Sequence, residues 1–237
     1  MDKILAVGCS HTDYYFKSLF HPEMDTSWPK WPEVFTNNID NAICNNIGLS
    51  GIGNDIILKK VLYECSLNRY DIVLVLWTDI TRIDIYDTHT FFPSLPIREN
   101  NNFYRLHDKI NWIANGRVKG FYKIESSVDS FFKNLFILQE YCKTQSIKLV
   151  HGMSNETWDK EVLSVMIKNS LKYQSKLDDS LIGFPFISNV AGTTMRNDVI
   201  KRIGEKNAFI SDTDLHYSAA GQEVIGNIFY EKFKTIY

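Results

Sequence analysis

The sequence lacks the features that mark several common classes of protein. It has no CxxC pair, the spacing used by many structural zinc sites and dithiol redox sites. No apolar run approaches the roughly 20 residues that a membrane-spanning helix needs. Residues 1–8 contain one lysine and a short apolar run, which do not make a secretory signal. We therefore expect a cytoplasmic protein with reduced thiols and no membrane partner. The widely spaced cysteines are Cys9, Cys44, Cys65 and Cys142.

The charge and glycine patterns argue against two further classes of ligand. The chain has 26 basic and 28 acidic side chains, a net charge of −2, and its basic residues are scattered. Because nucleic-acid binders usually carry a basic patch or stripe, no nucleic-acid partner is expected. Neither a P-loop string nor a Gly-x-Gly-x-x-Gly motif follows the first apolar run. The sequence therefore gives no support to a nucleotide or flavin binder.

Short apolar runs rich in Val, Ile and Leu recur along the chain. With 237 residues, of which 44% are hydrophobic, the chain can bury a substantial core. The runs are continuous rather than alternating, which is typical of parallel strands covered on both faces. They predict five strands, at residues 3–8, 41–48, 71–77, 146–152 and 207–210.

Segments with helical spacing of apolar residues lie between and after these strands, at 53–68, 126–145 and 218–237. Alternation of strand and helix predicts a doubly wound α/β sandwich in a single domain. Residues 80–124 are too long for a plain connection, and loops of that length are usually functional or contain small elements. We therefore expect an insertion after the third strand.

Reactive side chains follow the first and the last predicted strand. Ser10 comes directly after the first strand, and Asp212, Asp214 and His216 follow the fifth. In an open parallel sheet, ligands bind outside the carboxyl ends of the strands, so these residues can converge on one edge. A histidine that accepts the serine proton, oriented by a carboxylate, makes serine a nucleophile. The order predicts a serine–histidine–acid site.

Four short sequence blocks, spread along nearly the whole chain, contain glycine, serine, asparagine, aspartate and histidine residues in a characteristic order. The blocks are Gly8–Thr12, Asn46–Gly51, Leu76–Asp79 and Asp214–Ser218. In this order, and with these strands before them, they resemble the SGNH hydrolases, also called the GDSL esterase/lipase superfamily. The resemblance implies a flavodoxin-like three-layer α/β/α sandwich with a mainly parallel five-stranded sheet. The whole chain, 1–237, would be one such domain.

The resemblance also implies roles for individual residues. Ser10 would be the nucleophile, His216 the general base and Asp214 the carboxylate that orients it, with Asp212 as the alternative acid. The backbone N–H groups of Ser10 and Gly51 would contribute to an oxyanion hole. Such donors stabilise charge that appears only in the transition state. This chemistry needs no metal ion and no organic cofactor.

The sequence departs from the family pattern at two positions. Cys9 replaces the usual aspartate, a position that we interpret as structural. Thr78 stands where the family has the asparagine whose side-chain amide completes the oxyanion hole. Asn54 is the nearest residue whose side-chain amide could serve instead. The alternative interpretation is that Asn54 caps the start of the following helix.

The sequence therefore predicts a serine ester hydrolase that acts through an acyl-enzyme on a small ester, such as an O-acetyl group of a carbohydrate. The alternatives are a binding module or an interaction protein with the same fold. His151, after the fourth strand, is interpreted as a hydrogen-bonded rim residue or a substrate contact. Phe91 and Phe92 in the insertion would either select the substrate or pack the insertion itself.

Overall fold

The computed structural model describes residues 1–80, 124–154, 160–184 and 194–237. A four-stranded sheet forms the centre of this part of the chain, with every neighbouring pair parallel and the strand order β2-β1-β3-β4. The order confirms the predicted mainly parallel α/β fold. The strands are β1 (Asp2–Gly8), β2 (Ala42–Asn46), β3 (Ile72–Trp77) and β4 (Lys148–Met153).

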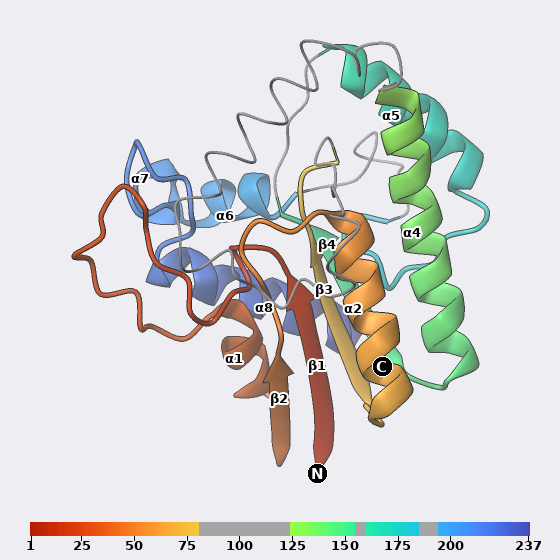
Figure 1. The fold of residues 1–237 in the computed structure, drawn as a ribbon, viewed down its shortest axis with the longest axis horizontal. Helices are drawn as coiled ribbons and strands as arrows, with labels where there is room; N and C mark the ends of the chain where they lie inside the picture. The colour runs from red at the N-terminus through yellow and green to blue at the C-terminus, as the bar shows by residue number, and fades with distance from the viewer. Residues whose placement is uncertain (81–123, 155–159, 185–193) are drawn as a thin grey trace, which may run out of the picture.

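Helices cover both faces of the sheet (Figure 1). Successive residues of a strand point to opposite faces, and both faces here are apolar, so each needs a helical layer. One layer contains α2 (Asn54–Leu67), α4 (Ile124–Thr144) and α5 (Lys160–Tyr173). The other contains α1 (Trp31–Thr36), α6 (Met195–Ile203) and α8 (Ala219–Ile236). The result is a three-layer α/β/α sandwich.

The predicted strand at 207–210 is wrong. Residues Glu205–Ala208 form the short helix α7, and Phe209 makes only an isolated antiparallel bridge with Tyr217. A four-residue apolar run does not distinguish a strand from a helical turn by its periodicity. Beyond β4, the described neighbours are Leu181 and Thr194, which make isolated parallel bridges to the strand.

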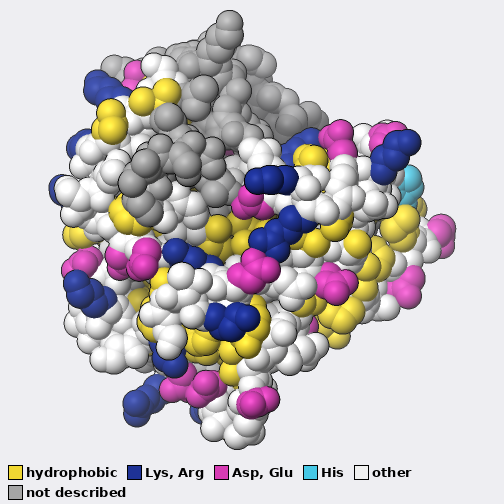
Figure 2. Space-filling view, turned by 180° about the vertical axis from the view of Figure 1, so that it is seen from behind, with side chains coloured by type: hydrophobic (Ala, Val, Ile, Leu, Met, Phe, Trp, Pro, Cys, Tyr) yellow, Lys and Arg dark blue, Asp and Glu magenta, His cyan; other side chains and the backbone are white. Residues whose placement is uncertain are grey.

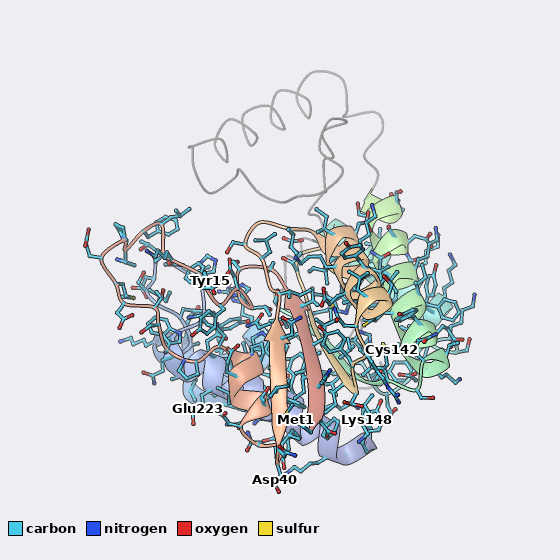
Figure 3. The ribbon with its side chains drawn as sticks, turned by 60° about the horizontal axis from the view of Figure 1, so that its bottom comes forward. Met1, Tyr15, Asp40, Cys142, Lys148 and Glu223 are labelled. Carbon is cyan, nitrogen blue, oxygen red and sulfur yellow. The ribbon has the colours of Figure 1, made fainter. Side chains whose placement is uncertain are left out.

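The carboxyl ends of the parallel strands meet at one edge of the sheet. Figure 3 shows Met1 and Lys148, at the amino ends of β1 and β4, on the opposite side of the molecule from Tyr15. The segments that follow β1 and β3 therefore begin at one edge, where the sequence predicted the site. Most of the predicted insertion, with Phe91 and Phe92, lies outside the described residues.

The described surface carries charges of both signs. On the face shown in Figure 2, Lys and Arg side chains are interspersed with Asp and Glu side chains, and no continuous basic stripe runs across its described part. None of the helices in the described ranges combines the length and the apolar character needed to cross a bilayer.

Candidate active site

Ser10 lies on a tight turn directly after β1. The carbonyl oxygen of Cys9 accepts hydrogen bonds from the backbone N–H groups of Thr12 (2.8 Å) and Asp13 (3.1 Å). Gly8 lets Thr12 pack closely, because a Cβ atom at position 8 would lie 2.1 Å from the Thr12 hydroxyl oxygen. The Cys9 side chain is buried in the core. The turn therefore buries Cys9 and leaves the Ser10 hydroxyl to contact another loop.

Ser10, His216 and Asp214 form a continuous chain of hydrogen-bonding groups. His216 Nε2 lies 3.0 Å from Ser10 Oγ, and His216 Nδ1 lies 2.5 Å from Asp214 Oδ1. An ionised carboxylate only accepts hydrogen bonds, so the imidazole proton belongs on Nδ1 and leaves Nε2 as an acceptor for the serine proton. This geometry can activate a serine hydroxyl.

Asp214 is the acid that contacts His216. Its side chain is only 1% exposed, and Oδ1 also accepts the backbone N–H of His216 at 3.1 Å. Burial disfavours ionisation, but hydrogen bonds from Ser18 and His216 outweigh burial and hold the pKa of the Asp214 carboxyl below its ordinary value. Asp212, the alternative acid, is exposed. The structure thus brings together Ser10, His216 and Asp214.

The segment between β1 and α1 contributes contacts that the sequence did not predict. The Phe16 ring centroid lies 4.2 Å from that of His216, and Ser18 Oγ donates to Asp214 Oδ2 at 2.5 Å. His11 is buried with its ring centroid 5.1 Å from His216. The one available signal was a connection after β1 rich in proline and tryptophan, and no motif identifies Ser18 within it.

Gly51 lies in the loop between β2 and α2. Its φ of +87° is in the left-handed region, where glycine avoids the steric cost that other residues meet. Two contacts hold this loop beside the Ser10 turn. The Leu49 N–H donates to the Gly8 carbonyl oxygen at 2.9 Å, and Asp13 Oδ2 accepts the N–H (3.0 Å) and hydroxyl (2.7 Å) of Ser50. Asp13 therefore anchors the residue that precedes Gly51.

Thr78 lies directly after β3, only 1% exposed, and its hydroxyl oxygen has no hydrogen-bond partner among the described residues. Its backbone N–H donates to Asn54 Oδ1 at 2.9 Å. Asn54 Nδ2 donates to the carbonyl oxygens of Thr78 (3.2 Å) and Asp79 (3.4 Å). Asn54 thus links the start of α2 to the end of β3. It does not cap α2, whose N-cap is Gly53, and its amide already binds the backbone.

His151 is part of the core and not a rim residue. Its side chain is fully buried, and its Nδ1 accepts a hydrogen bond from Trp77 Nε1 at 2.9 Å. Burial lowers the pKa of His151 to about 3, which keeps the ring neutral. Within the described ranges, no cluster of His, Cys, Asp or Glu has the geometry to hold a metal ion.

No protein-family model and no curated protein matches the sequence. Solved structures match the fold. One is the psychrotrophic esterase EstA from Pseudoalteromonas, with 12% identity, 99% of this chain and 98% of that chain covered, and a TM-score of 0.51. Another is a mutant of an acetyl-xylooligosaccharide esterase from Geobacillus, with 13% identity, 98% and 94% covered, and a TM-score of 0.53.

A third structure is described as a lipolytic protein of the G-D-S-L family from Desulfitobacterium hafniense. The match covers 98% of this chain and 99% of that chain. It has 10% identity and a TM-score of 0.50. At such low identities, these comparisons establish a shared fold. The chain therefore has the fold of the SGNH (GDSL) hydrolases, the class that its four sequence blocks indicated.

Proposed function

We propose that the protein is a serine ester hydrolase of the SGNH type, acting through an acyl-enzyme on a small acyl ester. The observation that carries the proposal is the chain from Ser10 through His216 to Asp214, with distances of 3.0 and 2.5 Å between the bonded atoms. The fold shared with esterases supports the reaction class by analogy.

In the first half of the reaction, Ser10 Oγ attacks the ester carbonyl carbon while its proton moves to His216 Nε2. Asp214 stabilises the imidazolium that forms. The carbonyl π-electrons move onto oxygen and form a tetrahedral oxyanion. When that intermediate collapses, the bond from carbon to the alcohol oxygen breaks, and His216 returns its proton to the departing alcohol. The acyl group is then esterified to Ser10.

In the second half, His216 Nε2 takes a proton from a water molecule that attacks the acyl-enzyme carbonyl. Collapse of the second tetrahedral intermediate breaks the bond to Ser10 Oγ, which recovers its proton from His216. The products are a carboxylic acid and the free enzyme. Every proton transfer uses side chains of this chain, so the mechanism includes no metal ion or cofactor.

The backbone N–H groups of Ser10 and Gly51 are assigned to the oxyanion hole, with Thr78 in the place of the family asparagine. An O-acetyl group on a carbohydrate is the proposed substrate class. Its support is the fold shared with an acetyl-xylooligosaccharide esterase. A binding or interaction protein with the same fold is the second candidate, favoured by the threonine at position 78.

Fluorophosphonate labelling distinguishes the two candidates, since the reagent phosphonylates only an activated serine. We expect stoichiometric labelling of Ser10, located by peptide mass spectrometry, and none in Ser10→Ala. A screen of acetylated sugars and short-chain aryl esters then identifies the substrate class. Absence of both labelling and ester turnover in the folded protein would favour the binding or interaction protein.

Substitutions of Thr78 test the oxyanion hole. Loss of one oxyanion donor typically costs about 10²–10³ in turnover. A threonine offers one hydroxyl on a short β-branched side chain, so we expect Thr78→Ala to cost less than that range. Thr78→Asn should raise kcat on a simple aryl acetate. A loss above a hundredfold in Thr78→Ala would instead mean that the hydroxyl is already a full donor.

Asp13→Asn tests the anchor of the Gly51 loop. Hydrogen bonds to a charged group contribute about 1.5–3 kcal/mol, so we expect kcat to fall about tenfold or more with little change in KM. Asp25→Asn is the matched control. Asp25 accepts the backbone N–H of Ser27, two residues on, just as Asp13 accepts that of Tyr15, but Asp25 is exposed. Equal effects in the two variants would contradict the anchoring role.

A further inference from the structure

The segment between β1 and α1 is hydrogen-bonded to the loop that contains Asp214. Ser18 Oγ donates to Asp214 Oδ2 at 2.5 Å and accepts the backbone N–H of His21 at 2.9 Å. His21 Nε2 lies 2.8 Å from Ser211 Oγ, which accepts the backbone N–H of Asp214 at 3.0 Å. These contacts close a ring of hydrogen bonds through two residues of each segment.

The ring supplies a hydrogen-bond donor to the second oxygen of the buried Asp214 carboxylate. Asp214 is 1% exposed and Ser18 is 3% exposed, so water has little access to the bond between them. His216 occupies Oδ1 with its ring and its backbone N–H. Among the described residues, Ser18 is the one that donates to Oδ2. A hydroxyl bonded to an ionised carboxylate forms a strong, directional hydrogen bond.

We propose that Ser18 is a positioning residue that holds the Asp214 carboxylate with Oδ1 toward His216, an inference that rests on the proposed hydrolase function. The carboxylate turns about its Cα–Cβ and Cβ–Cγ bonds, and bonds at both oxygens fix one orientation. With that orientation fixed, His216 keeps its proton on Nδ1 and its free acceptor toward Ser10. His21 and Ser211 support the two ends of the ring.

The competing explanation is that Ser18 only fastens two loops together. Ser18 Oγ also accepts the His21 N–H at 2.9 Å, and His21 Nε2 lies 2.8 Å from Ser211 Oγ, so loss of the Ser18 hydroxyl could loosen the two loops without acting through the carboxylate. The two explanations differ when Asp214 is absent. A positioning residue then has nothing to position, whereas a fastening residue affects the site through the rest of the ring. A double-mutant cycle measures this difference.

The cycle compares wild type, Ser18→Ala, Asp214→Ala and the double variant, each shown to be folded by thermal melting. We expect Ser18→Ala alone to lower kcat about tenfold or more with KM nearly unchanged, the effect of one bond to a charged group. In the Asp214→Ala background, the same change should alter neither the residual turnover nor the slow rate of fluorophosphonate labelling. Equal fold-losses in the two backgrounds would overturn the proposal.

A second measurement does not need turnover. The proton on His216 Nδ1 lies between that nitrogen and a carboxylate oxygen 2.5 Å away, so we expect it to give a far-downfield proton NMR resonance. The Asp214→Ala variant should identify this resonance by its loss. Ser18→Ala should shift or broaden this resonance, and an unchanged resonance would refute the positioning of Asp214. If the wild type hydrolyses no ester but its resonance still shifts or broadens in Ser18→Ala, the proposed function fails while the positioning contact stands.

Ser170→Ala is the matched control. Ser170 is a buried serine on α5, and its hydroxyl oxygen has no hydrogen-bond partner among the described residues. The substitution removes the same atom as Ser18→Ala but no contact with Asp214. We expect an unchanged kcat and an unchanged His216 resonance. If Ser170→Ala lowered kcat as much as Ser18→Ala does, the loss would be a general effect of buried serines and the proposal would be overturned.

Discussion

Ser10→Ala should reduce the hydrolysis of a simple aryl acetate to the background rate. The Ser10 hydroxyl is the group within hydrogen-bond distance of His216 Nε2, and alanine leaves no atom to carry the acyl group. Loss of the nucleophile in serine hydrolases typically costs on the order of 10⁶ in kcat. Initial rates at saturating substrate measure the loss, and mass spectrometry of a quenched reaction should show no acyl-enzyme.

Cys9→Ala provides the control, because Cys9 is the adjacent side chain and a stronger intrinsic nucleophile. Its thiol is buried in the core, so its removal should affect packing and leave most of the turnover. Thermal melting separates the effect on stability from the effect on rate. The reverse outcome, in which Cys9→Ala is inactive and Ser10→Ala is active, would show that the cysteine is the nucleophile.

The central strands were predictable because both faces of the sheet are covered. Continuous apolar runs such as 72–77 are typical of strands whose side chains are buried on both faces, and β3 is indeed buried at every position. The run at 207–210 is shorter, and its residues Ala208 and Phe209 are buried in the core cluster that includes α8, without joining the sheet as a strand. The period of so short a run does not distinguish a strand from a helical turn.

The sequence predicted that Ser10, Asp214 and His216 would converge, and the structure brings their polar atoms within hydrogen-bond distance. The strand-end rule explains the place of Ser10 after β1, but Asp214 and His216 lie in the loop between α7 and α8 and not after the predicted strand. The rule could not place Ser18, because no periodicity or motif relates residue 18 to residue 214. It also left Asp212 and Asp214 as alternatives. Which of them turns inward depends on the local backbone of that loop, where the Asp214 N–H binds Ser211.

We expect Asp214→Asn to lower kcat by about 10⁴, the size of the loss that asparagine causes at the equivalent position of a serine–histidine–aspartate triad. A carboxylate only accepts hydrogen bonds, so it keeps the His216 proton on Nδ1. An asparagine amide donates as well as accepts. When its NH₂ group faces Nδ1, the proton moves to Nε2, which then no longer accepts the proton of Ser10.

Asp212→Asn is the matched control in the same loop, since it makes the same chemical change at an exposed carboxylate. Its kcat should stay within about twofold of wild type, because exposed substitutions away from a buried contact usually have small effects. Both variants should melt cooperatively, which confirms that neither loss is one of folding. Equal small losses in the two would mean that Ser10 and His216 act as a dyad without a carboxylate. A large loss confined to Asp212→Asn would mean that Asp212, and not Asp214, orients His216.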